Sequence, residues 1–154
     1  MTRTPRASTI VRIDPHAAFA LFTGEIALWW KPTPRRKVGL RGGTLYFEGE
    51  SSGRLCERLD DQVYEVGRVL AWRPGELLRF EWRAPSFEPG EATEVEVRFE
   101  PEGEGTRVSV EHRGWERIPD ERLRRGLDDS SFESMLGLWW GDLLTALRWF
   151  AGSR

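Results

Sequence analysis

The chain has 154 residues, of which 39% are hydrophobic and 31% are charged, and its formal net charge is −2. This length predicts one domain with its own core over residues 1–154, and the balanced charge excludes a field that would attract nucleic acid. The single cysteine, Cys56, excludes an intrachain disulfide and a thiolate zinc cluster, and we expect a cytoplasmic protein because no apolar stretch is typical of a signal peptide or a membrane span.

The N-terminal part of the chain predicts one strand followed by two short helices. Residues 8–14 alternate as a strand, after which Asp14 and Pro15 supply a helix N-cap and a first helical position. Two short apolar segments follow, separated by Gly24. Pro32 and Pro34 end the second segment, because neither residue can continue a helix.

Residues 44–113 alternate between apolar and polar side chains in a series of short segments separated by turns. This pattern is typical of antiparallel strands with one buried and one solvated face. We expect strands at residues 44–48, 54–59, 63–72, 77–84, 93–100 and 106–113.

The C-terminal part predicts one long amphipathic helix over residues 128–151, capped by Asp128, Asp129 or Ser130. Residues 120–127 are predicted as a short helix or a mobile segment. The helix needs a large apolar surface, and only the sheet supplies one. The predicted fold is therefore α+β: a curved antiparallel sheet of six to seven strands around a long C-terminal helix, with two short helices after the first strand. The apolar stripe of the helix consists of Phe132, Met135, Leu136, Trp139, Trp140, Leu143, Leu144, Leu147 and Phe150.

Several local motifs accompany this order of elements: Trp29-Trp30-Lys31-Pro32, Gly42-Gly43-Thr44-Leu45, Gly67 to Pro74 leading to Leu78-Arg79-Phe80-Glu81-Trp82, Gly105-Thr106-Arg107-Val108 leading to His112-Arg113-Gly114-Trp115, and Trp140 with Leu143, Leu144 and Leu147. Together they resemble the activator of heat-shock-protein-ninety ATPase homologue family. This family belongs to the SRPBCC group, whose helix-grip fold is shared by START lipid-transfer domains and birch-pollen-allergen proteins. The resemblance implies a hydrophobic cavity between the sheet and the terminal helix, and it does not imply one shared activity. The family usually carries Gly immediately before the terminal-helix Trp, where this chain has Trp139.

The eight Trp and eight Phe residues are the strongest functional signal in the sequence. In most folds such side chains only pack, but in a helix-grip fold they tend to line a pocket of several hundred Å3, on the order of a small-molecule site. The candidate ligand-binding residues are Trp29, Trp30, Phe47, Phe80, Trp82, Phe99, His112, Met135, Trp139 and Trp140.

His112 is the strongest candidate for reactive chemistry, because it alternates in phase with Val108 and Val110 and should face inward. It could orient a polar group of a ligand or act as a general base, although a lone inward histidine is more often a structural hydrogen-bonding residue. His16 is expected at the surface. No spacing of Cys and His predicts a metal site, and no motif predicts a cofactor or a serine nucleophile.

Three functions follow from these observations. The leading hypothesis is a non-enzymatic protein that binds a small hydrophobic or aromatic molecule between the sheet and the terminal helix. The first alternative, a co-chaperone-like ATPase activator with a chaperone partner, rests on the family resemblance alone. The second alternative is a cyclase or hydrolase-like enzyme that uses His112 as its base. The sequence does not specify the ligand or the oligomeric state.

Overall fold

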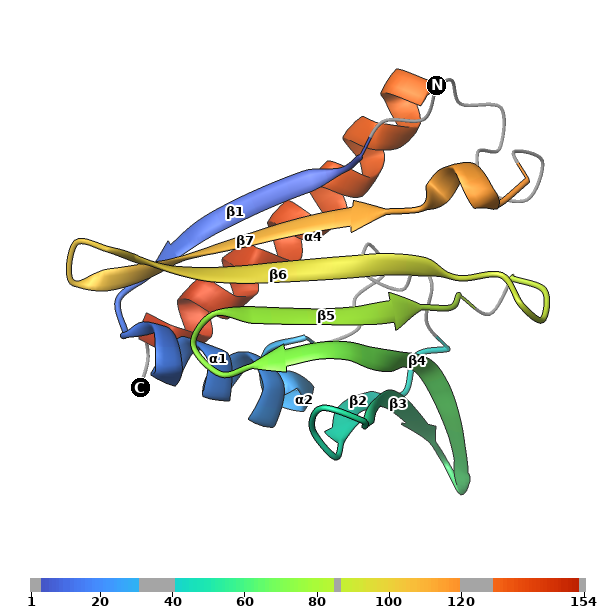
Figure 1. Cartoon of the computed structure of the whole chain (residues 1–154), viewed down its shortest axis with the longest axis horizontal. Helices are drawn as coiled ribbons and strands as arrows, with labels where there is room; N and C mark the ends of the chain where they lie inside the picture. The colour runs from blue at the N-terminus through green and yellow to red at the C-terminus, as the bar shows by residue number, and fades with distance from the viewer. Residues whose placement is uncertain (1–3, 31–40, 85–86, 120–128, 153–154) are drawn as a thin grey trace.

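The computed structural model describes residues 4–30, 41–84, 87–119 and 129–152. Seven antiparallel strands form one curved sheet in the order β1-β7-β6-β5-β4-β3-β2, and α4 crosses one face of it (Figure 1). The fold is the predicted α+β helix-grip arrangement. The elements are β1 (Arg6–Val11), α1 (Pro15–Gly24), α2 (Ile26–Trp29), β2 (Thr44–Glu48), β3 (Arg54–Leu59), β4 (Gln62–Arg73), β5 (Leu77–Trp82), β6 (Thr93–Glu102), β7 (Gly105–Arg113), the 3-10 helix η1 (Trp115–Arg117) and α4 (Asp129–Gly152).

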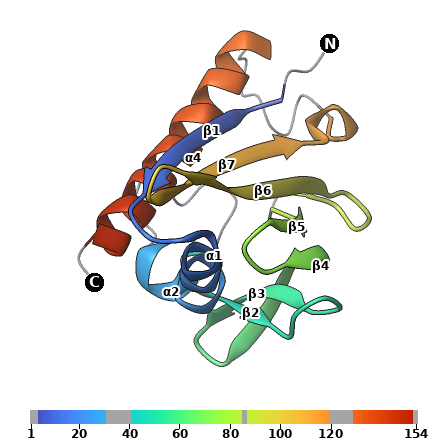
Figure 2. The ribbon, with the colours of Figure 1, turned by 60° about the vertical axis from the view of Figure 1, so that its left-hand side comes forward.

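The predicted start of α1 is confirmed. The Asp14 carboxylate accepts a hydrogen bond from the Ala17 amide at 2.8 Å, and Pro15 occupies the first helical position. This cap explains why β1 stops at Val11 rather than at residue 14. Figure 2 shows α1 and α2 close together beside the C-terminal half of α4.

The inward face of the sheet is formed by alternate residues of the central strands. Phe80 of β5 pairs with Val95 of β6, and Val97 of β6 pairs with Val110 of β7. These side chains are buried beneath α4, as the alternation predicts. The side chains of α4 that pack against the sheet are all buried: Phe132, Leu136, Trp139, Trp140, Leu143, Leu144 and Leu147.

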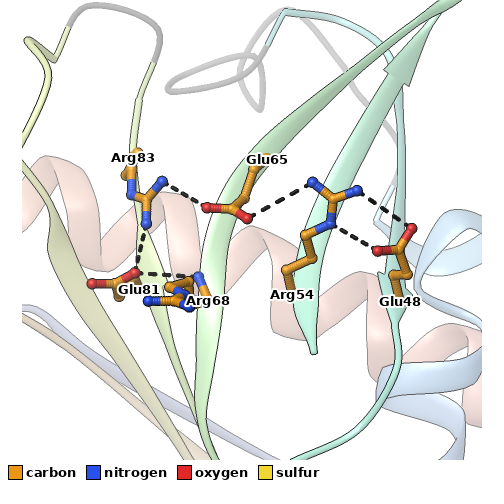
Figure 3. Close-up of polar contacts among 6 residues, drawn as sticks. All are labelled: Glu48, Arg54, Glu65, Arg68, Glu81 and Arg83. Carbon is orange, nitrogen blue, oxygen red and sulfur yellow. Dashed lines mark hydrogen bonds and ion pairs between the residues drawn. The ribbon is translucent and has the colours of Figure 1, made fainter. Parts of the chain in front are cut away.

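The outward face of strands β2 to β5 carries a ladder of ion pairs (Figure 3). Arg54 lies 2.8 Å from Glu48, and Arg83 lies 2.7 Å from Glu65 and 2.8 Å from Glu81. Each of these side chains is partly exposed, so solvent screens each pair and its contribution to stability is small. These charged residues of the alternating pattern therefore lie on the solvated side of the sheet.

Some predicted features fall outside the described residues. They are the prolines Pro32 and Pro34 after α2, the segment 120–127, and the cap residue Asp128. The long helix itself is confirmed, beginning at Asp129 and ending at Gly152.

Candidate ligand-binding site

Four tryptophan side chains from α4, β5 and the end of α2 meet between the sheet and the terminal helix. Trp30 stacks on Trp82 with ring centroids 5.6 Å apart and planes at 11°. Its ring also meets the edges of Trp139 at 5.9 Å and Trp140 at 5.3 Å. Trp139 lies 5.7 Å from Trp82 and 5.0 Å from Trp140. We call Trp30, Trp82, Trp139 and Trp140 the tryptophan cluster; all four rings are buried.

His112 lies beside this cluster, and both of its ring nitrogens are hydrogen-bonded. The indole N–H of Trp140 donates to Nδ1 at 3.0 Å, and Nε2 lies 2.7 Å from the Thr93 hydroxyl. Because an indole N–H can only donate, Nδ1 must be the unprotonated nitrogen, and Nε2 must carry the proton that it donates to Thr93. The Thr93 hydroxyl in turn donates to the Trp82 carbonyl at 3.2 Å. The four groups form one continuous chain of donors and acceptors.

This arrangement keeps His112 neutral. The side chain is fully buried, and desolvation lowers its pKa from 6.5 to about 3. Its one lone pair is already occupied by Trp140, so no nitrogen is available to take a proton from a substrate. In this geometry His112 fixes the orientation of Trp140, and its lone pair is occupied by the Trp140 N–H.

The other predicted aromatic residues form a second group nearer to α1. Phe47 contacts Phe80 at 5.7 Å and Trp72 at 5.8 Å. Trp72 contacts Phe19 of α1 at 5.2 Å, and Phe19 lies 5.2 Å from Phe99, which also contacts Phe22 of α1. Trp29 joins the two groups. Its ring lies 5.7 Å from Trp30 and 4.8 Å from Phe22, and its N–H donates to the Phe22 carbonyl at 3.2 Å.

Met135 lies apart from both groups. Its side chain is 37% exposed on α4, whereas Trp29 and Trp30, expected at the mouth of a pocket, are buried. The structure therefore brings nine of the ten predicted residues into contact with other aromatic rings and leaves Met135 at the surface.

Two residues of the site were absent from the sequence prediction. Thr93 precedes Val95 in the inward series of β6, so extending the alternation by one step would have found it. Trp115 of η1 lies 4.5 Å from the His112 ring and 5.3 Å from Phe132, and it follows His112 within one of the motifs described above. A turn at Gly114, where φ is 94°, brings Trp115 back over the sheet.

Three indole N–H groups of the site have no hydrogen-bond acceptor within the described residues. They belong to Trp30, Trp115 and Trp139, whose rings are all buried. A buried donor without an acceptor costs about 1–3 kcal/mol, so native proteins contain few of them. By contrast, the N–H groups of Trp29 and Trp140 are satisfied.

Other kinds of site receive no support from the described part of the chain. Within residues 4–30, 41–84, 87–119 and 129–152 there is no group of three or more His, Cys, Asp or Glu side chains that could hold a metal ion. No helix among these residues is long and apolar enough to cross a membrane.

The model of one protein family, described as activator of Hsp90 ATPase homolog 1-like protein, matches residues 12–135. The chain belongs to this family. The match confirms the resemblance that the motifs indicated, and it extends from the end of β1 into the first half of α4. A comparison with curated proteins found no match.

Solved structures share this fold over nearly the whole chain. Protein MLL2253 from Mesorhizobium loti is 18% identical, with 98% of each chain covered and a TM-score of 0.67. The self-sacrificing resistance protein CalC from Micromonospora echinospora is 23% identical, with 97% of this chain and 94% of that one covered and a TM-score of 0.62. The anthrahydroquino-γ-pyrone synthase Txn09, complexed with SUM, is 29% identical over 94% of each chain, with a TM-score of 0.57.

Proposed function

We propose that this chain binds a small, flat, neutral molecule with oxygen acceptors at the tryptophan cluster, between the sheet and α4. The observation that carries this proposal is the pair of unsatisfied indole N–H groups of Trp30 and Trp139. The two rings contact each other, so their donors belong to one small region. A carbonyl, ether or hydroxyl oxygen of a ligand would satisfy them and remove the cost of leaving them unpaired.

The chemistry of the surrounding side chains limits the class of ligand. The cluster offers aromatic faces for stacking, and its described polar neighbours, His112 and Thr93, are neutral and hydrogen-bonded to each other. No charged side chain takes part in the described contacts of the cluster. A charged ligand would therefore lose its hydration without gaining a counterion. An oxygenated polycyclic aromatic compound fits better than a fatty acid.

Binding requires the rings to separate, because they contact one another in this structure. The stacked pair of Trp30 and Trp82 is the natural point of entry, since its nearly parallel planes could accept a third flat ring between them. Trp30 follows the four-residue helix α2, whose displacement would widen this gap. The synthase Txn09, complexed with SUM, supports small-molecule binding in this fold.

The test is isothermal titration of the purified chain with emodin, 1,4-naphthoquinone, cholesterol and palmitate, preceded by native mass spectrometry to detect a co-purified molecule. We expect the aromatic compounds to bind and palmitate not to bind. Replacing Trp139 by β-(3-benzothienyl)alanine keeps both fused rings and removes the N–H, so affinity should fall about three- to tenfold. Trp149→Phe, at an exposed ring outside the cluster, is the matched control and should leave affinity unchanged. Absence of binding by both aromatic compounds would refute the proposal.

An enzymatic function that uses His112 as its base receives no support from the geometry. Both ring nitrogens are engaged, and the pKa of about 3 leaves the imidazole a very weak base. Turnover would require Trp140 to withdraw its N–H first. If a polyketide-like substrate is converted and His112→Ala abolishes conversion while binding persists, the enzymatic alternative replaces the binding proposal.

A chaperone-related function is the second candidate, and the family match favours it. The test is the ATPase rate of the purified chaperone at saturating amounts of this chain. Stimulation would support the co-chaperone alternative, and an unchanged rate would eliminate it. For either function we infer a cytoplasmic location, which the buried free thiol of Cys56 favours.

A further inference from the structure

A concave site separate from the tryptophan cluster lies between β1 and the C-terminal end of α4. A groove of about 990 Å3 runs between β1 and the last turns of α4, and its lining includes Ser8, Ile10, Arg12, Arg107, Arg148 and Trp149. We call it the edge groove. None of its lining residues belongs to the tryptophan cluster or to the second aromatic group.

One wall of the edge groove is the outer edge of β1, which is exposed at Ser8 and Ile10, whereas the Arg6 carbonyl at the start of the strand lies close to Gly137 of α4. β1 is the terminal strand of the sheet, and among the described strands it pairs only with β7. The His112 amide donates to the Pro5 carbonyl at 3.0 Å, which fixes the alternation of hydrogen bonds along this pair. Thr9 and Val11 therefore direct their backbone groups toward β7. Ser8 and Ile10 direct theirs away from it, into the groove.

The side chains of the edge groove add positive charge and apolar surface. Arg12 and Arg148 are exposed, and neither forms an ion pair within the described part of the chain. Arg107 also lines the groove, although Glu102 lies 2.8 Å from its guanidinium. None of the described residues that line the groove is acidic. Trp149 is 76% exposed and Ile10 is 42% exposed, so the groove presents apolar surface to solvent.

We propose that the edge groove binds an extended acidic segment of a partner protein, which adds as a strand to the free edge of β1. The backbone of the segment would pair with Ser8 and Ile10, its carboxylates would face Arg12 and Arg148, and an apolar side chain would cover Trp149. This is the β-strand-addition mode of peptide recognition, in which backbone pairing gives affinity and side chains give selectivity. A second copy of this chain fits worse, because a two-fold contact would place this positively charged groove against an identical groove with the same charge.

The binding test uses a fluorescein-labelled, end-blocked peptide of alternating Glu and Val, followed by fluorescence anisotropy at low salt. We expect binding that weakens as salt is added, and no binding of the matching Lys and Val peptide. The double substitution Arg12→Glu with Arg148→Glu should weaken binding at least about tenfold. Arg73→Glu, at an exposed arginine of β4 outside the groove, is the matched control and should change it less than about twofold.

Two further readouts separate strand addition from simple charge attraction. An acidic peptide with alternate backbone nitrogens methylated cannot pair with β1 and should bind at least about tenfold more weakly. In hydrogen exchange, the amides of Ser8 and Ile10 should be fast in the free protein and protected in the complex, whereas those of Thr9 and Val11 should be slow in both. Equal binding of the methylated peptide, insensitivity to the arginine substitutions, or a dimer that forms through β1 without any peptide binding would each overturn the proposal.

Discussion

Trp140 of α4 donates its indole N–H to Nδ1 of His112 on β7 at 3.0 Å, so a hydrogen bond between side chains ties the terminal helix to the sheet inside the apolar core. The same histidine reaches Thr93 on β6 through its other nitrogen. Because every group in this chain is satisfied, the polar cluster can be buried without a large penalty. It fixes the rotation of α4 and therefore the position of the tryptophan rings that face the candidate ligand.

His112→Ala should lower the free energy of unfolding by about 2–4 kcal/mol, because it leaves a cavity and deprives the Trp140 N–H of its acceptor. Urea denaturation followed by circular dichroism measures this change. His16→Ala is the matched control: this exposed histidine should contribute less than about 0.5 kcal/mol. Equal effects of the two substitutions would contradict the structural role of His112.

Stability should depend on pH through His112. Its pKa is lowered by burial from 6.5 to about 3, so the unfolded chain binds a proton that the folded chain does not accept between these values. The contribution of neutral His112 to the unfolding free energy is therefore fully present above pH 6.5, and it is lost progressively as the pH falls toward 3. Between pH 7.5 and pH 5.5 the wild type should lose on the order of 1 kcal/mol more unfolding free energy than His112→Gln, which has no titrating side chain at this position. Parallel pH dependence of the two proteins would show that the histidine is not buried in its neutral form.

A buried glutamate on β3, Glu57, fixes the backbone that leads into β2. The carboxylate of Glu57 accepts the amides of Arg41 at 2.9 Å and Gly43 at 2.8 Å, and its side chain is fully buried. Glu57→Gln should cost about 1–3 kcal/mol of unfolding free energy, because a neutral amide accepts these bonds less well and adds a buried N–H donor. Glu65→Gln in the partly exposed ladder is the comparison and should cost about 1 kcal/mol or less. Thermal and urea unfolding of both variants would show whether Glu57→Gln lowers the unfolding free energy more than Glu65→Gln does.

Two glycines should respond in opposite directions to alanine. A Cβ at Gly67 of β4 would collide with the backbone carbonyl of Glu81 on β5, so Gly67→Ala should destabilise the sheet by about 1–3 kcal/mol or more. Gly141 of α4 has open space around the same position. Gly141→Ala should therefore stabilise the protein by about 0.5–1 kcal/mol through helix propensity. A shift of both melting temperatures in the same direction would contradict this assignment.

Most of the fold could be predicted because local patterns and tertiary structure agree. The alternation at Val95, Val97 and Phe99 required one buried face, and the spacing of apolar residues in α4 required a sheet beneath it. Boundaries were less accurate. β1 begins and ends earlier than the alternation indicates, because the residues after Val11 lead into the cap at Asp14.

The site was harder to predict than the fold. Alternation placed His112 on the inner face, but its two hydrogen bonds come from Thr93 and Trp140, which lie far away in sequence. Periodicity also could not separate Met135, exposed on α4, from Trp139 one turn later, because the apolar stripe is wider than the surface that the sheet covers. The unsatisfied N–H groups emerge only from three-dimensional contacts.

The most direct test of the account follows the eight tryptophan indole N–H resonances in 1H–15N spectra while emodin is added. We predict that the resonances of Trp30 and Trp139 shift to values typical of hydrogen-bonded indoles, while that of Trp140 stays where its bond to His112 already places it. Assignment uses single Trp→Phe variants. If only the exposed Trp149 responds, or if Trp30 and Trp139 do not shift at any ligand concentration, the tryptophan cluster is a packed core and not a binding site.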